Sequence, residues 1–244
     1  MEKFNKTKVL EYSKRFSGIG PFSGLERNPE DVKPENAVIV FNNTAYLIFI
    51  RAKYLFVAIL NSISSPVAER NEFAALVLLK AYWETVAAFG YAVLTMEPLL
   101  STKDYEGIFN LAKRLGLGGK KFPSTQMLDK KGLAQEDFLI PNVLTMMDKI
   151  DKDWNKIFKR SGIKPLSSFS EEYDNFIAEA GHPTYSGLQI AGKWSKDRRT
   201  LVPDISKCWE YKDEKMLFNY LALGSTIFFY YWDNFQKLVK PDKK

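Results

Sequence analysis

The stretch PVAERNEFAALVLLKAYWETVAAFGYAVLTM, residues 66–96, decides the fold of this chain. From residue 73 onward its only charged residues are Lys80 and Glu84, so as a helix it is apolar on almost every face. A helix of this kind has no side suited to water, and other helices must surround it. The stretch therefore predicts a long central helix in an all-α protein.

The ends of this helix and the place of its two charges follow from the same residues. Ser65 is a favourable N-cap, and Pro66 suits the first helical position because its missing N–H would have no partner there. Pro98 marks the other end, because a proline disfavours helical geometry at the residue before it. Lys80 and Glu84 lie one turn apart on a stripe of apolar residues, so we expect a buried pair. A structural ion pair, or a lysine that reaches the surface, would explain them without any function.

Hydrophobic periodicity and capping residues predict helices along the rest of the chain. The second nearly all-apolar helix is 212–239. Another helix is predicted over 35–63, and because a tight junction joins it to the central helix, the 35–63 helix should lie antiparallel to the central one. The fold class is therefore an all-α, single-domain bundle of about six to eight helices over residues 1–244, with two nearly all-apolar central helices. Residues 1–34 are expected to form an N-terminal helix and loop that pack on the bundle, and 184–203 an irregular loop. The other predicted helices are 2–16, one capped by Ser101 or Thr102 that runs to Arg114, one over 141–162, and one over 171–180 capped by Ser168 or Ser170.

Charge and rare residues limit the classes of function. The chain has 35 basic and 29 acidic residues, a net charge of +6 that permits polyanion binding without requiring it. A single cysteine, Cys208, excludes an intramolecular disulfide framework, and a single histidine, His182, excludes zinc sites built from several histidines. Acids at the start of the 171–180 helix are ordinary complements of the helix dipole. We therefore expect no metal and no cofactor.

The distribution of apolar residues predicts a cytoplasmic protein without membrane contact. The first 16 residues are charged throughout and lack the apolar core of a signal peptide. The longest uncharged run, Met216–Trp232, has 17 residues and includes several polar ones, whereas a membrane span needs about 20 predominantly apolar residues. This run is expected to be a buried helix, and its apolarity would suit either a deep core or a homodimer interface.

Two segments resemble the DUF5677-like family of bacterial helical proteins. They are LLKAYWETVAAFGY, residues 78–91, and YDNFIAEAGHPTYSG, residues 173–187. In that family a long buried helix carries a basic residue and a glutamate, and a later helix ends in a histidine followed by proline or a small residue. Lys80, Glu84 and His182 match these positions, with lysine where arginine is more frequent. The resemblance implies an α-helical bundle with a polar cluster inside.

The family is similar in turn to the HEPN superfamily of helical bundles, which includes RNA-cleaving toxins. The diagnostic HEPN motif is an arginine, four to six residues and then a histidine. The corresponding positions before His182 are Asn175, Phe176 and Ile177, and none is arginine. The resemblance thus implies a related scaffold, while the motif of the HEPN ribonucleases is missing.

The candidate catalytic residues are His182, Glu84 and Lys80. If they met, His182 would act as a general acid or base, Glu84 would fix its tautomer and Lys80 would stabilise a phosphate. Alternatively, His182 only caps the end of the preceding helix, where a cationic ring suits the dipole. The basic segment KWSKDRR, residues 193–199, joins cations to an aromatic ring, as in grooves for single-stranded nucleic acid, although seven residues are too few for a specific signal and a solvated loop explains it better. The candidate binding residues for nucleic acid or another ligand are Lys193, Trp194, Lys196, Arg198, Arg199 and Tyr185.

Three classes of function are compatible with this pattern. The first is a non-catalytic binding or self-association module, expected to be a homodimer, in which the Lys80 and Glu84 pair serves specificity. The second is a HEPN-like phosphodiester-acting enzyme that uses His182 on RNA or another polyanion. The third is a small-ligand-binding protein with an aromatic pocket formed by Trp83, Tyr91, Trp154 and Tyr185.

Overall fold

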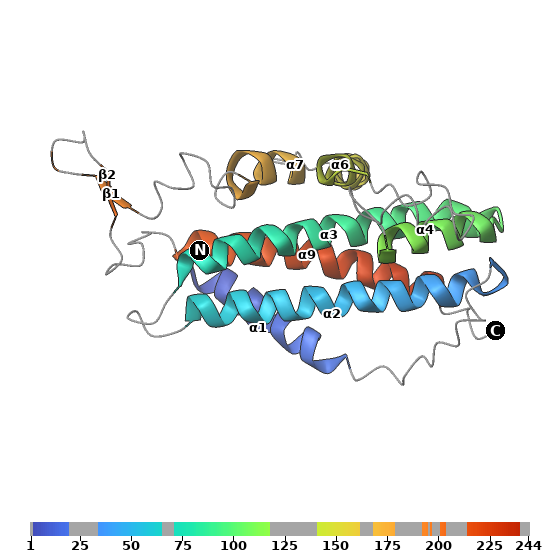
Figure 1. Ribbon diagram of the computed structural model, residues 1–244, viewed down its shortest axis with the longest axis horizontal. Helices are drawn as coiled ribbons and strands as arrows, with labels where there is room; N and C mark the ends of the chain where they lie inside the picture. Colours follow the sequence, from blue (N-terminus) through green and yellow to red (C-terminus); the bar gives the residue numbers. More distant parts are fainter. Residues whose placement is uncertain are drawn as a thin grey trace, which may run out of the picture.

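The computed structural model describes residues 2–19, 34–64, 71–117, 141–161, 168–178, 192–194, 196, 201–203 and 214–239. They form an all-α bundle, as the sequence predicts (Figure 1). A 3₁₀ turn, η2 (Pro34–Asn36), precedes α2, and a π-helical segment, η5 (Tyr173–Ala178), continues α7. The α-helices are α1 (Glu2–Gly18), α2 (Ala37–Ser64), α3 (Glu72–Ser101), α4 (Tyr105–Leu117), α6 (Val143–Arg160), α7 (Phe169–Glu172) and α9 (Glu214–Val239).

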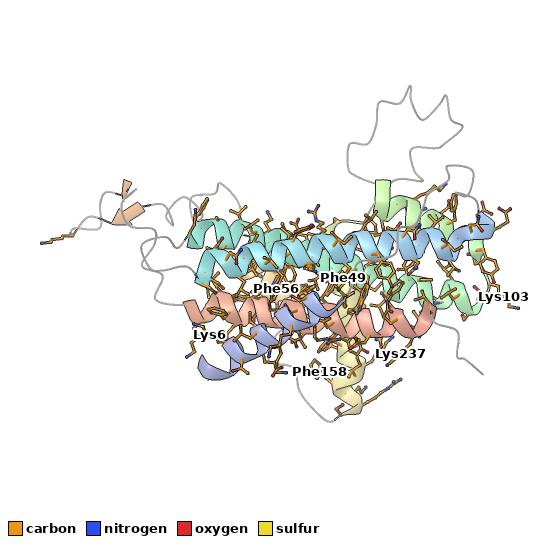
Figure 2. All side chains as sticks on the ribbon, turned by 90° about the horizontal axis from the view of Figure 1, so that it is seen from below. Lys6, Phe49, Phe56, Lys103, Phe158 and Lys237 are labelled. Atoms are coloured by element: carbon orange, nitrogen blue, oxygen red, sulfur yellow. The ribbon has the colours of Figure 1, made fainter. Side chains whose placement is uncertain are left out.

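Three long helices, α2, α3 and α9, lie side by side along the long axis of the molecule (Figure 1). The Asn71 amide donates to the Ser62 carbonyl at 3.2 Å, and farther along Arg51 Nε donates to Thr85 Oγ1 at 3.1 Å. These contacts confirm that α2 and α3 are antiparallel. In contrast, α6 runs across this axis (Figure 2). Its first half is buried through Met146, Met147 and Ile150.

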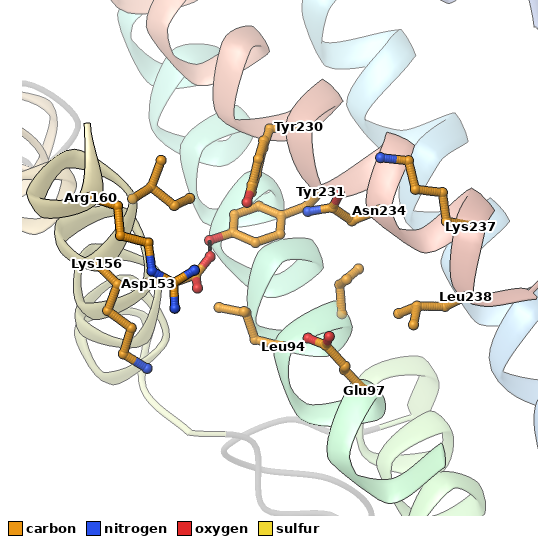
Figure 3. A pocket seen from close by; sticks show the side chains of 12 residues that line it. Leu94, Glu97, Asp153, Lys156, Arg160, Tyr230, Tyr231, Asn234, Lys237 and Leu238 are labelled. Atoms are coloured by element: carbon orange, nitrogen blue, oxygen red, sulfur yellow. Dashed lines mark hydrogen bonds between the residues drawn. The ribbon is translucent and has the colours of Figure 1, made fainter. Parts of the chain in front are cut away.

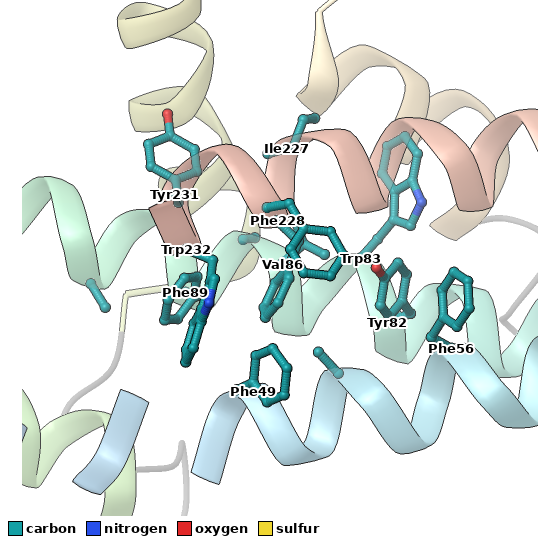
Figure 4. Packing of buried hydrophobic residues seen from close by; sticks show 14 of the residues in the cluster. Phe49, Phe56, Tyr82, Trp83, Val86, Phe89, Ile227, Phe228, Tyr231 and Trp232 are labelled. Carbon is teal, nitrogen blue, oxygen red and sulfur yellow. The ribbon is translucent and has the colours of Figure 1, made fainter. Parts of the chain in front are cut away.

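Large aromatic side chains fill the space between α2, α3 and α9 (Figure 4). The Phe228 ring lies 5.0 Å from the ring of Phe89 and 5.9 Å from that of Phe49, measured between centroids. Phe49 in turn lies 4.4 Å from Trp232. Aromatic pairs at such distances add about 0.5–1.5 kcal/mol beyond the burial of their surface. Aromatic residues make up 14% of the chain, and many of their rings lie in one continuous core.

The first helix, α1, packs on α9 although the two are far apart in the sequence. Phe16 is buried 4.6 Å from the ring of Phe229, and the Tyr12 hydroxyl shares a hydrogen bond of 2.7 Å with Thr226 Oγ1. At the surface an ion pair of 2.6 Å joins Arg15 to Asp233. The described helix of the predicted 1–34 unit thus contacts α9, whereas residues 20–33 lie outside the described residues.

The ends of α3 differ from the prediction. The helix begins at Glu72, where the Asn71 side chain accepts a hydrogen bond from the Ala74 amide at 2.9 Å, so Ser65 is not its N-cap. It ends at Ser101, with Pro98 inside the last turn. A proline near the end of a helix removes only its own N–H bond, and the neighbouring turns retain theirs.

Two further local predictions are corrected. The cap of α4 is not Ser101 or Thr102, because the Asp104 carboxylate accepts the bond from the Gly107 amide at 2.9 Å. The 184–203 stretch, expected to be irregular, contains β1 (Gly192–Trp194) and β2 (Leu201–Pro203), which pair antiparallel. Such short strands lie below the length at which alternation of apolar and polar residues is visible.

Gly90 allows α6 and α9 to approach α3 closely. A Cβ atom at this position would lie 2.7 Å from Ile150 Cδ1 and 2.9 Å from Tyr231 Cδ2. We expect Gly90→Leu to lower the free energy of unfolding by about 3 kcal/mol, because overpacking forces both neighbours to move. Gly18→Leu is the control, since a Cβ atom there meets nothing within 4 Å. Urea denaturation followed by circular dichroism measures both, and equal effects of the two substitutions would contradict the close packing.

Candidate functional site

Glu84 is the predicted site residue with the clearest partner. It lies on α3, half-buried, and accepts a hydrogen bond of 2.7 Å from the Tyr173 hydroxyl to Oε1. Burial raises the pKa of Tyr173, and the adjacent Glu84 carboxylate raises it further. Lys80, one turn earlier, is also half-buried. The expected burial of both charges is therefore corrected: their stripe faces the partly covered side of α3.

The start of α7 is fixed by several polar contacts, which place Tyr173 against α3. Ser168 forms a capping box with Glu171, which confirms Ser168 as the N-cap. The Asp151 carboxylate of α6 accepts bonds from the Phe169 amide at 2.6 Å and the Ser170 amide at 3.0 Å. A carboxylate at the first turn of a helix is favourable for the dipole. α6 thus sets the position from which Tyr173 reaches Glu84.

An aromatic contact also packs the start of α7 against the core. The Trp83 ring stacks on Phe169 with centroids 4.5 Å apart, and its indole N–H donates to the Tyr220 carbonyl at 3.1 Å. The Tyr220 hydroxyl donates to Glu172 Oε2 at 2.9 Å. α3, α7 and α9 therefore meet beside Glu84.

The helix predicted over 171–180 changes its winding immediately after the first turn. Residues 173–178 form the π-helix η5, a geometry that is rare and frequently found at functional sites. His182 follows four residues later and lies outside the described residues. Its meeting with Lys80 and Glu84 therefore stays a prediction.

The basic segment is described only in part. Lys193 and Trp194 belong to β1, where Trp194 pairs with Leu201, and Lys196 is exposed. Arg198, Arg199 and Tyr185 lie outside the described residues. The predicted nucleic-acid surface thus stays a prediction.

The described members of the predicted aromatic pocket have separate partners. Trp83 is fully buried, whereas Trp154 lies 5.4 Å from Tyr230 and 5.5 Å from Phe158. Tyr91 is half-buried beneath the Lys149 ammonium, which lies 4.8 Å from its centroid. Within the described part of the chain, these rings form no common stack.

A pocket of about 460 Å³ opens where α3, α6 and α9 meet (Figure 3). At its back the Tyr231 hydroxyl donates to Asp153 Oδ2 at 3.0 Å. Burial raises the pKa of Tyr231, and the Asp153 charge raises it further, so this phenol stays protonated at neutral pH. The lining residues are Val93, Leu94, Glu97, Asp153, Lys156, Ile157, Arg160, Tyr230, Tyr231, Asn234, Lys237 and Leu238.

The sequence contains a signal for this pocket, namely polar residues at helical spacing, which the apolar periodicity of the same helices obscures. Asp153, Lys156 and Arg160 are spaced by three and four residues, which puts them on one face of α6. Asn234 and Lys237 have the same spacing on α9. The spacing alone does not show that the two faces meet, because that depends on the crossing of α6 over the bundle.

No group of three or more His, Cys, Asp or Glu side chains that could hold a metal lies within the described ranges. Comparison of the chain with models of protein families, with curated proteins and with solved structures finds no match.

The bond between Tyr173 and Glu84 predicts a pH-dependent effect of Tyr173→Phe. At neutral pH the variant loses a hydrogen bond to a charged group, and we expect its free energy of unfolding to fall by about 1 kcal/mol. In the wild type the raised pKa of Tyr173 contributes stability below the ordinary tyrosine value of 10.0, and this contribution is lost as the pH rises above it. The difference between the two proteins should therefore shrink in alkaline buffer.

Urea denaturation at neutral and alkaline pH measures this difference. Tyr105→Phe is the control, because Tyr105 is 46% exposed. A deficit of Tyr173→Phe that is constant with pH would contradict the proposed linkage.

Proposed function

We propose that this protein is a non-catalytic module that self-associates through one face of α2. The observation that carries the proposal is a stripe of five large apolar side chains along this helix. Their spacing follows one helical face, and Tyr54 and Leu47 are the most exposed, at 72% and 59%. We name this set the α2 stripe: Ile39, Leu47, Ile50, Tyr54 and Val57.

The area of the α2 stripe matches the apolar part of a dimer interface. The five side chains are 37–72% exposed, and together they form an apolar patch on the order of a few hundred Å². A standard interface buries about 800 Å² per partner, of which about 56–65% is apolar. Of the 18 consecutive residues of α2 that are most apolar, only 28% are buried in the bundle, whereas the corresponding share for α3 is 56%. α2 thus leaves more of its apolar length uncovered than α3 does.

The register of the α2 stripe supports a second copy of this chain as its partner. Antiparallel pairing about the midpoint between Leu47 and Ile50 sets these two residues against each other. The same pairing sets Ile39 against Ala58, the residue next to Val57. A two-fold interface requires such self-complementarity. The two charged residues of α2, Arg51 and Lys53, come opposite Tyr46 and Thr44 in this register, so like charges are not opposed.

A lipid bilayer is the competing partner for this surface. α2 and α3 are each long and apolar enough to cross a membrane by length and composition, a test that core helices of soluble proteins also pass. Against lipid stands Arg51 near the middle of α2, since an arginine at the centre of a bilayer costs about 2.5–3.5 kcal/mol or more. In the bundle Arg51 instead donates to Thr85 on α3.

We expect Leu47→Lys to convert a dimer into a monomer. The substitution puts a cation into an apolar contact of each protomer, and lysine keeps the helix propensity of leucine. Leu10→Lys on α1 is a matched control, because Leu10 is 54% exposed but lies outside the α2 stripe. Sedimentation equilibrium should show a dissociation constant at least about tenfold higher for Leu47→Lys alone, a change of 1.4 kcal/mol or more.

Flotation with vesicles of neutral and of anionic phospholipids separates the two partners. A monomeric wild type would overturn the proposal, as would equal dimerisation of both variants. Flotation of the wild type that Leu47→Lys abolishes, without dimerisation, would assign the α2 stripe to lipid instead.

A further inference from the structure

The pocket between α3, α6 and α9 gathers cationic side chains. Lys156 and Arg160 come from α6 and Lys237 from α9, while Glu97 faces them from α3 (Figure 3). Within the part of the chain that the structure describes, none of the three cations forms an ion pair or a hydrogen bond. These cations are therefore available to a ligand.

The acidic groups of the pocket balance the cations only in part. The lining has three cations and two carboxylates. One carboxylate, that of Asp153, already accepts the bond from the Tyr231 hydroxyl. Tyr231 in turn is 0% exposed, so this pair forms a fixed wall. Counted at their formal charges, the three cations and two carboxylates of the described lining leave a net charge of +1 (3 − 2), and the pocket favours an anion.

The rest of the wall is apolar. Leu94 and Ile157 face the pocket from α3 and α6, and Tyr230 adds an aromatic ring from α9. The volume of about 460 Å³ lies within the range of pockets for small molecules. In such pockets a small number of polar groups fixes the orientation of the ligand, and the apolar wall removes the body of the ligand from water.

We infer that this pocket binds a small organic anion, a phosphate monoester or a carboxylate with an aromatic or aliphatic body. Arg160 and Lys156 contact the anionic group, since a guanidinium can donate two parallel bonds to a phosphate or carboxylate. The body of the ligand packs against Tyr230, Leu94 and Ile157. This site is separate from the α2 stripe, and its occupation does not depend on self-association.

Saturation-transfer NMR with the full chain tests the inference. The probes are phenyl phosphate and phenylacetate, with benzyl alcohol and benzylamine as the neutral and cationic analogues. We expect both anions to bind and the analogues to bind at least about tenfold more weakly, as expected for a charge-assisted contact. The ratio of the two anions tells whether a phosphate or a carboxylate is preferred.

Matched variants connect the binding to the pocket. Arg160→Gln should raise the dissociation constant of the preferred anion about tenfold. Lys159→Gln should leave it within about twofold, because Lys159 is the neighbour of Arg160 in the last turn of α6 but does not line the pocket. Circular dichroism checks that both variants fold.

Three results would overturn the inference. Binding of benzylamine as tight as that of the anions would assign the pocket to a cation. Equal binding of benzyl alcohol would show that only the apolar wall matters. Equal effects of Arg160→Gln and Lys159→Gln would show that the anions respond to general surface charge.

Discussion

The fold depends on the contact of aromatic rings where α2, α3 and α9 meet. Phe228 is in contact distance of Phe49 and Phe89 (Figure 4). It is also in contact distance of Phe16, so a single side chain joins four helices. Burial of each such ring contributes about 1.5–3 kcal/mol. Buried hydroxyls within the core are satisfied locally, as where Tyr82 and Ser225 share a bond of 2.8 Å. The outer helices then attach to a core that is already filled.

Much of the fold could be predicted from the sequence because the apolar runs are long. The predicted ranges 35–63 and 212–239 lie within two residues of α2 and α9 at each end. The start of α3 could not be predicted in the same way. Ser65 and Asn71 are both good N-cap residue types, six residues apart, and the one that caps the helix, Asn71, also makes a backbone hydrogen bond to Ser62 on α2. Capping preference is a local property of the sequence, and it does not tell which of two such residues begins the helix when tertiary contacts decide.

Single residues of the candidate site could be predicted from the sequence, but their partners could not. Glu84 was recognised from its apolar surroundings, but its bond to Tyr173 spans 89 residues. A helix that is apolar on every face also gives no signal for which face is outermost, so the half-buried position of Lys80 and Glu84 could not be derived. The pocket between α3, α6 and α9 could not be predicted either, because it depends on how α6 crosses the bundle.

The packing of α1 on α9 has a consequence for the order of folding during synthesis. Tyr12 and Thr226, which share a hydrogen bond, are 214 residues apart. At about 5–20 residues per second the ribosome needs roughly 10–40 s to make the chain between them. During that time Phe16 has no α9 to cover it, and the first helix is among the last to dock. Nascent chains of this protein therefore expose an aromatic helix to chaperones until α9 has been synthesised.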